Sequence, residues 1–206
     1  MKKNIFWDFD GVILDSLPIK DFGFIKIFEN YPKKLVKEFL IYNKINSGLS
    51  RFHKIKYFYN HLLKKDIDNK KVLSYAEKFT KIMKKKLSSK KYLIKDSLIY
   101  IKSNYKNYNF HLVSASEHNE LNYLCKKLNL DKYFLTIDGS PTPKINLIRD
   151  LLKKLKYKKK ETIYIGDSVN DLEAAKINKI DFYGYNEKKL MSKSTVYIDT
   201  FRNISI

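Results

Sequence analysis

Cysteine, arginine, glycine and proline are all scarce in this chain of 206 residues. The single cysteine, Cys125, excludes an internal disulfide and a cysteine-based zinc site, which favours a reducing compartment. No run reaches the roughly 18 apolar residues of a membrane span, and the first residues lack the apolar stretch of a secretory signal. These absences predict a soluble, cytoplasmic protein that does not enter a membrane.

Acidic residues are also few, because 22 Asp and Glu stand against 42 Lys and Arg, for a formal net charge of +20. Only three of the basic residues are arginine, and the lysines are scattered along the chain. Base recognition and two-pronged phosphate contacts favour arginine. We therefore interpret the charge mainly as solvated lysines, and nucleic-acid binding is the less favoured alternative.

Hydrophobic residues, in contrast, make up 44% of the chain, enough for a sizeable core. Short β-prone runs alternate with amphipathic helical patterns in the carboxyl-terminal half, and one further run lies at the amino terminus. This order predicts an α/β fold, a Rossmann-like three-layer α/β/α core with a mainly parallel sheet. The strands are expected at 3–9, 110–113, 134–137, 162–165 and 180–183, and core helices at 117–128, 143–155 and 170–178.

Residues 17–91 show helical spacing and no clear strand, with helices expected at 19–30, 34–46, 51–64 and 70–87. We refer to this segment as the helical insert, because it separates the first core strand from the second. The core is then formed by residues 1–16 and 92–206.

Acidic side chains follow two of the predicted strands. Asp8 and Asp10 end the first strand on the same side, and Asp167 with Asp171 one helical turn later follows the strand at 162–165. The carboxyl ends of parallel strands meet at the edge of a sheet where ligands bind. Like charges this close need a cation, and oxygen ligands without His or Cys indicate Mg²⁺.

Groups suited to a phosphate are expected at the same edge. The segment LVSAS presents the Ser114 hydroxyl and the backbone amides after it, and GSPTPK places Lys144 near a helix start. A hydroxyl, free amides and an ammonium beside a metal and a carboxylate are what a phosphoryl group requires.

In their order, the segments DFDGV, LVSAS and GDSVND, with Lys144 between the last two, resemble the motifs of the haloacid dehalogenase superfamily, in its capped phosphoglycolate phosphatase and β-phosphoglucomutase-like subgroup. The resemblance implies that Asp8 is the nucleophile and that Asp10 is the general acid and base. It implies that Mg²⁺ is held by Asp8, the backbone carbonyl of Asp10 and Asp167, with support from Asp171. The phosphate-binding residues it implies are Gly11, Ser114, Ala115 and Lys144.

The helical insert looks like the cap of that superfamily, with SGLSR similar to its substrate-facing loop. Arg51 is expected to set substrate specificity with Ser50, and a cap-to-core ion pair is the alternative for Arg51. The implied function is a Mg²⁺-dependent phosphatase of a small sugar, polyol or amino-alcohol phosphate, acting as a monomer or homodimer. A phosphomutase is the main alternative, although the residues after Ser16 lack the His that those mutases usually place there. A nucleic-acid-binding protein or a nucleotide-end phosphatase is the less favoured alternative.

Overall fold

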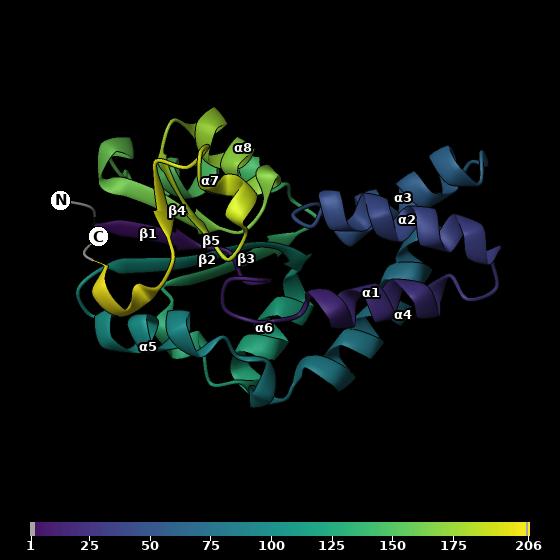
Figure 1. Cartoon of the computed structure of the whole chain (residues 1–206), viewed down its shortest axis with the longest axis horizontal. Helices are drawn as coiled ribbons and strands as arrows, with labels where there is room; N and C mark the ends of the chain where they lie inside the picture. The colour runs from purple at the N-terminus through teal and green to yellow at the C-terminus, as the bar shows by residue number, and fades with distance from the viewer. Residues whose placement is uncertain (1–2, 205) are drawn as a thin grey trace.

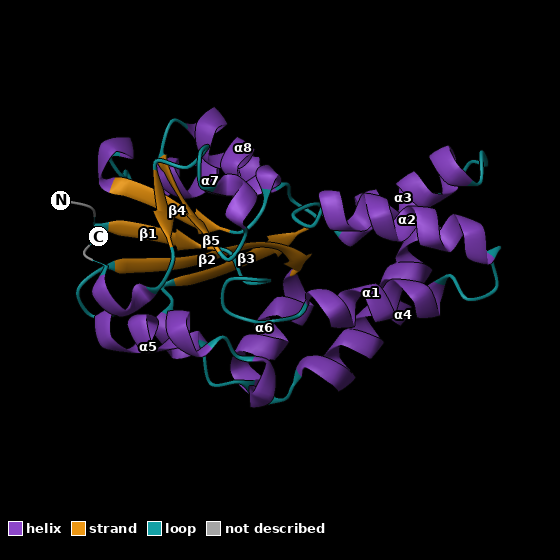
Figure 2. Ribbon diagram, in the orientation of Figure 1, coloured by secondary structure: helices purple, strands orange, loops and turns teal. Residues whose placement is uncertain are grey.

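The computed structural model describes residues 3–204 and 206, and a parallel sheet of six strands forms its centre (Figure 2). Each neighbouring pair of strands is parallel, in the order β3-β2-β1-β4-β5-β6. The first strand of the chain therefore lies inside the sheet, with the chemistry-bearing strands β2 and β4 on either side. The strands are β1 Asn4–Trp7, β2 Asn109–Glu117, β3 Thr136–Ser140, β4 Thr162–Gly166, β5 Asp181–Tyr185 and β6 Val196–Ile198.

Helices cover both faces of the sheet (Figure 1). The helices α7 (Lys144–Lys154) and α8 (Val169–Asn178) lie on one face, and α5 (Lys95–Asn104) and α6 (His118–Lys127) lie on the other. Alternate residues of β1 serve the two faces, since Phe6 packs in the α7 and α8 layer whereas Ile5 and Trp7 pack in the opposite one. The predicted Rossmann-like three-layer α/β/α core is confirmed.

The helical insert forms a separate bundle beyond the carboxyl ends of the strands (Figure 1). It consists of α1 (Leu17–Ile27), α2 (Lys33–Ile45), α3 (Arg51–Tyr57) and α4 (Asn69–Leu87), and a π-helical turn, Phe58–Leu62, continues α3. Aromatic rings fill its interior in edge-to-face and stacked pairs, which explains how so short a bundle is held together. The buried rings are Phe24, Phe28, Phe39, Phe58 and Phe79.

The two chain connections to the insert run side by side. The Asp15 amide donates to the Tyr92 carbonyl at 2.8 Å, and the Ile94 amide donates to the Ile13 carbonyl at 2.9 Å. Bonds of this kind hold the start and the end of the insert together, and the division into domains near residues 16 and 92 stays a prediction.

The structure differs from the predicted elements where the local pattern is weak. Helix α5 and strand β6 were not predicted, since α5 has little apolar periodicity and β6 has three residues. The strand expected at 134–137 is β3, displaced toward Ser140 because a 3₁₀ turn ends at Tyr133. Within residues 3–204, no helix combines the length and apolar character needed to cross a membrane. The 3₁₀ turns are Lys90–Tyr92, Asp131–Tyr133, Lys159–Glu161, Lys188–Leu190 and Phe201–Asn203.

Candidate active site

The sheet brings the predicted carboxylates together at its carboxyl edge. Asp8 directly follows β1, and its amide donates to the Ile165 carbonyl of β4 at 2.9 Å. Asp167 directly follows β4, and Asp171 lies in the first turn of α8. One carboxylate oxygen from each of these three aspartates lies within 4.8 Å of the others. The neighbouring positions of β1 and β4 in the sheet are therefore what creates the acidic cluster.

Lys144, the first residue of α7, lies between two of these carboxylates. Its Nζ lies 2.9 Å from Asp8 Oδ2 and also donates to Asp171 Oδ1. Burial lowers the pKa of Lys144, but the charges of Asp171 and Asp8 outweigh burial, so the net pKa is raised. Asp171 also accepts from Tyr164 Oη at 3.1 Å and from Ser168 Oγ at 2.6 Å. Since both of its oxygens already have donors, Asp171 fits a supporting role rather than direct metal ligation.

The remaining carboxylate oxygens fit a divalent cation. Asp8 Oδ1 is buried and has no hydrogen-bond partner among the described residues. Burial, Asp171 and Asp8 together raise the pKa of Asp167 well above its usual value. A Cβ atom at Gly11, whose φ is +76°, would overlap the Asp167 carboxylate, so only glycine admits it. Unsatisfied oxygen ligands without nitrogen or sulfur are the chemistry that Mg²⁺ prefers.

Burial also raises the pKa of Asp8, to about 7, with contributions from Asp171 and Asp10 and an opposing one from Lys144. A bound cation would favour the charged carboxylate over the neutral acid. The electrostatics of the cluster therefore agree with its geometry.

Asp10 has a different environment, surrounded by donors. Its Oδ1 accepts from Ser16 Oγ at 2.5 Å, and its Oδ2 accepts from Ser116 Oγ at 2.8 Å and lies 2.5 Å from Lys20 Nζ. Burial raises the pKa of Asp10, but the Lys20 charge and these hydrogen bonds outweigh burial and lower the pKa to about 2. Two aspartates separated by one residue thus have opposite pKa shifts.

Lys20 and Ser116 were missed by sequence reasoning, although the sequence contains a signal for each. Lys20 lies four residues after Ser16, the residue that precedes α1, so the two are one helical turn apart on the same side. Ser116 lies two residues after Ser114, on the same side of β2. The Ser114 hydroxyl itself lies 3.4 Å from Asp10 Oδ2. The four-residue spacing of a helix after Ser16 and the two-residue spacing of a strand after Ser114 are therefore the signals in the sequence for Lys20 and Ser116.

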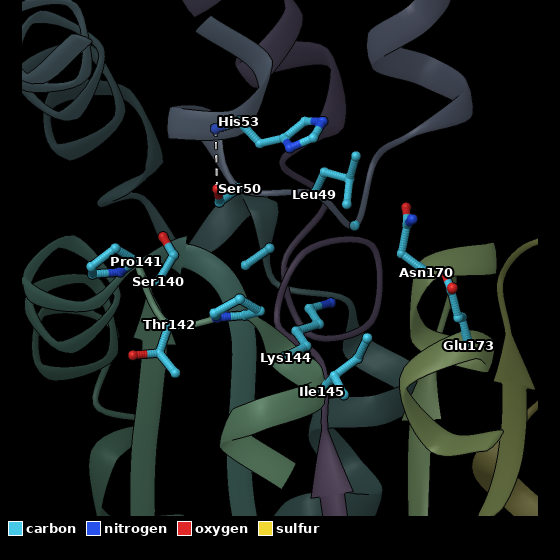
Figure 3. Close-up of a pocket in the computed structure, with 13 residues that line it drawn as sticks. Leu49, Ser50, His53, Ser140, Pro141, Thr142, Lys144, Ile145, Asn170 and Glu173 are labelled. Atoms are coloured by element: carbon cyan, nitrogen blue, oxygen red, sulfur yellow. Dashed lines mark hydrogen bonds between the residues drawn. The ribbon is translucent and has the colours of Figure 1, made fainter. Parts of the chain in front are cut away.

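Two adjoining cavities lie between the core and the helical insert. The smaller one is directly over the carboxylates, and Gly48 and Ala115 help to line it. The larger one, of about 240 Å³, shares Gly48, Ala115 and Lys144 with it. Figure 3 shows Leu49, Ser50 and His53 of the insert facing Ser140, Thr142 and Lys144 of the core across this larger cavity.

Comparison with known proteins identifies the family that has this architecture. The family model of haloacid dehalogenase-like hydrolases matches residues 5–185. The chain belongs to this family. No curated protein matches the sequence. The family membership confirms the resemblance stated from the motifs, and with it the expectation of a hydrolase.

Solved structures share the fold of this hydrolase at low identity. CbbY from Rhodobacter sphaeroides in complex with xylulose-(1,5)bisphosphate has a TM-score of 0.79 at 15% identity, covering 100% of this chain and 97% of that one. For β-phosphoglucomutase from Clostridium difficile the TM-score is 0.77 at 17% identity, covering 100% and 94%. A predicted phosphoglycolate phosphatase from Haemophilus somnus has a TM-score of 0.72 at 16% identity, covering 97% and 95%.

The two predicted specificity residues of this hydrolase, Ser50 and Arg51, lie in different surroundings, since only Ser50 lines a cavity. Ser50 lines the larger cavity and begins α3, where its Oγ accepts from the His53 amide at 3.3 Å. Arg51 lines neither cavity and donates instead to Glu120 of α6 and to Thr80 of α4. This geometry does not support the expectation that Arg51 sets substrate specificity, because the guanidinium is paired with Glu120 and lines neither cavity. The structure matches the alternative, an ion pair between insert and core.

Proposed function

We propose that this hydrolase is a Mg²⁺-dependent phosphatase that hydrolyses a small phosphomonoester through an aspartyl-phosphate intermediate. The observation that carries the proposal is the position of Asp8, held 2.9 Å from Lys144 and beside Asp167, with Asp10 two residues away. A nucleophile, a cation for the phosphate charge and a separate acid and base are the groups that phosphoryl transfer from an ester requires.

In the first step, a carboxylate oxygen of Asp8 attacks phosphorus. An oxygen-phosphorus bond forms, the bond from phosphorus to the alcohol oxygen breaks, and the departing oxygen takes a proton from Asp10. Asp10 has to carry that proton when the ester is bound, and the negative charge of the ester raises the pKa of Asp10 from the low value that Lys20 sets in the free site. In the second step, a water molecule attacks the phosphoryl group on Asp8 and gives a proton to Asp10. The bond between Asp8 and phosphorus then breaks, inorganic phosphate leaves, and both aspartates return to their starting states.

The residues that would hold Mg²⁺ are Asp8, Asp167 and the backbone carbonyl of Asp10. When bound, the ion would offset the negative charge of the phosphoryl oxygens and of the aspartates. Lys144 supplies a second positive charge beside Asp8, while Ser114 and the amides near Gly11 and Ala115 would orient the phosphate. Asp171 holds Lys144 in place through its contact with Nζ.

The helical insert would act as the cap of the site. Its turn at Ser47 and Gly48 lines the cavity over the carboxylates, and a Cβ atom at Gly48 would lie 2.8 Å from Asn170 Cβ of the core. Glycine therefore permits this close approach. A cap that closes over the site excludes water until the ester has reacted and selects the alcohol.

The experiment is release of inorganic phosphate from a panel of sugar, polyol and amino-alcohol phosphates in the presence of MgCl₂. We expect turnover of some members of the panel by the wild-type protein, and a loss of at least about a thousandfold in Asp8→Asn. Asp150→Asn is the matched control, because Asp150 is exposed on α7 and pairs with Arg149. Acid quenching during turnover should leave one phosphoryl group on the peptide that contains Asp8.

Two outcomes would contradict the proposal. Asp8→Asn activity within about tenfold of wild type would exclude Asp8 as the nucleophile. Conversion of a sugar phosphate into its isomer with little free phosphate, followed by ³¹P NMR, would assign the protein to the phosphomutases.

A further inference from the structure

The positive charge of the protein is concentrated in the helical insert. Residues 17–91 contain 20 basic and six acidic side chains, a formal net charge of +14, whereas the whole chain has +20. The insert makes up little more than a third of the chain, so its net charge per residue is several times higher than that of the core. Lysines that are scattered along the sequence are therefore unevenly distributed over the folded molecule.

A groove between α1 and α4 collects part of this charge. The two helices lie side by side (Figure 1) and pack through Phe24 and Phe79, whose ring centres are 4.5 Å apart. The groove beside this contact has a volume of about 590 Å³, against about 240 Å³ for the larger cavity of the site, and it shares no lining residue with either cavity of the site. Five lysines line it, namely Lys26, Lys78, Lys81, Lys85 and Lys86.

A carboxylate compensates only one of these five lysines. Glu29 is the single acidic side chain among the described residues that line the groove, and its carboxylate lies 3.1 Å from Lys26 Nζ. Within the part of the chain that the structure describes, the other four lysines have no carboxylate oxygen within 4 Å. All four are exposed. The groove therefore presents four unpaired ammonium groups to the solvent.

The spacing of the lysines on α4 is unfavourable for the helix by itself. Lys81 lies three residues after Lys78 and four residues before Lys85, so like charges are neighbours on one face of the helix. Such pairs destabilise a helix, whereas acidic residues at one of these positions would stabilise it. A multivalent anion bound along the groove would relieve this repulsion.

The dimensions and the lining of the groove favour a single strand of nucleic acid. Residues 78–85 extend over about 10 Å of helix, which corresponds to about three phosphates at the roughly 3.4 Å spacing of one strand. Phe22 and Ile82 add a half-buried apolar lining, and the centre of the Phe22 ring lies 4.4 Å from Lys86 Nζ. An aromatic ring beside cations suits a base next to its phosphate.

Other polyanions fit these observations less well. Inorganic polyphosphate has no apolar part to contact Phe22 and Ile82. An anionic membrane is disfavoured because the apolar face of α4 is buried inside the insert and cannot enter lipid. Lysine, as a point charge, contacts phosphates without reading bases, so no base sequence should be preferred.

We propose that the groove between α1 and α4 binds single-stranded nucleic acid through its phosphates. The inference goes beyond the proposed phosphatase function and does not depend on it, because the groove and the site have no residue in common. It revives the alternative that the scattered lysines of the sequence did not favour, since folding brings these lysines together.

The test measures the binding of a fluorescein-labelled oligouridine of about 12 nucleotides, within the known site sizes of roughly 4–16 nucleotides, by fluorescence anisotropy. We expect a dissociation constant of about 1–100 µM at physiological salt, the range of non-specific binding. The logarithm of the binding constant should fall with the logarithm of the KCl concentration with a slope of about −3, because each phosphate neutralised on a single strand contributes about −0.7.

The triple variant Lys78→Gln, Lys81→Gln, Lys85→Gln should bind the oligouridine at least about tenfold more weakly, with a slope smaller in magnitude by about 2. Its thermal stability should be at least that of the wild type, since repulsion along α4 is removed. Its release of phosphate from esters should be unchanged, because these lysines line neither cavity of the site.

The matched control is the triple variant Lys34→Gln, Lys37→Gln, Lys44→Gln. It removes the same charge from exposed positions of α2, on the same insert but outside the groove. This control should keep the slope of the wild type and bind the oligouridine within about threefold of it.

Four outcomes would overturn the inference. Equal weakening in the two triple variants would assign binding to net charge alone, and a wild-type dissociation constant above about 1 mM at physiological salt would exclude binding. Equal competition by inorganic polyphosphate with the same number of phosphates would show that the bases contribute nothing. Tighter binding to vesicles that contain phosphatidylserine would assign the surface to a membrane instead.

Discussion

Arg51 of the helical insert and Glu120 of the core form a two-pronged ion pair, with Arg51 Nη1 2.6 Å from Glu120 Oε2 and Nη2 2.7 Å from Oε1. The side chains are 3% and 0% exposed, and the guanidinium also lies 4.6 Å from the centre of the Phe79 ring. Arg51 directly follows the turn at Ser47 to Ser50 that lines both cavities. The pair therefore anchors that turn over the site from outside it.

Removing one partner of this ion pair should lower the free energy of unfolding far more than removing both partners. We expect Glu120→Leu to lower the free energy of unfolding by about 3–5 kcal/mol, because the Arg51 charge stays buried without a partner. The double variant Arg51→Met with Glu120→Leu should lose much less than the sum of its single changes. Urea unfolding of the four proteins measures the coupling, and additive losses would contradict it.

The pairing of Arg51 with Glu120 also leads to an expectation about catalysis. Since Arg51 lines neither cavity, Arg51→Met should lower kcat/KM by a similar factor for a metabolite ester and for an aryl phosphate. A loss confined to the metabolite ester would show instead that Arg51 contacts the substrate in a conformation with a different insert position.

Lys20 should orient Asp10 from the helical insert, since its Nζ lies 2.5 Å from Asp10 Oδ2 and donates to Ser116 Oγ at 3.0 Å. Lys20→Met is expected to reduce kcat about ten- to a hundredfold for alkyl phosphates, whose departing oxygen needs a proton. The loss should be at most a few-fold for p-nitrophenyl phosphate, whose departing oxygen does not. Lys26→Met, on the same helix but paired with Glu29, is the control. Equal losses on both ester types would refute the positioning role.

Mg²⁺ binding should be measurable without any substrate. A ligand at a hundred times its dissociation constant stabilises the native state by about 2.7 kcal/mol, which corresponds to a rise of about 5–10 °C in melting temperature for a chain of this size. Asp167→Asn should abolish this rise, and it should raise the melting temperature in EDTA because repulsion with Asp8 and Asp171 is relieved. An unchanged Mg²⁺ effect in Asp167→Asn would place the ion elsewhere.

His111 of β2 should make stability depend on pH. It is 1% exposed, both ring nitrogens lie 3.0 Å from hydroxyl groups, of Thr136 and Tyr157, and burial lowers its pKa to about 4. The unfolded chain, with a pKa of about 6.5 for this group, binds the proton more readily, so the stability present above pH 6.5 declines as the pH falls toward 4. Between pH 7.5 and 5 this group should remove about 2 kcal/mol.

His111→Gln should therefore show a smaller decline over that range in urea unfolding, while the exposed His61→Gln should decline as the wild type does. Parallel pH profiles for wild type and His111→Gln would contradict this, because they would show that the imidazole has the same pKa in the native and unfolded states.

The sequence by itself was sufficient for the alternation of strands and helices, the position of the insert and the four aspartates after β1 and β4. These features depend on local periodicity and on the rule that parallel strands end at one edge, so they need no knowledge of distant contacts. Lys144, adjacent to an unusual GSPTP segment, was likewise placed at a helix start, and the structure puts its Nζ 2.9 Å from Asp8.

Only the tertiary structure decided how the insert sits on the core. Arg51 could bind substrate or an acid of the core, and Glu120, 69 residues away, takes it. Lys20 reaches Asp10 for the same kind of reason. Which charges meet across two packed surfaces depends on the relative orientation of those surfaces, and this orientation results from many long-range contacts that no local pattern of residues encodes.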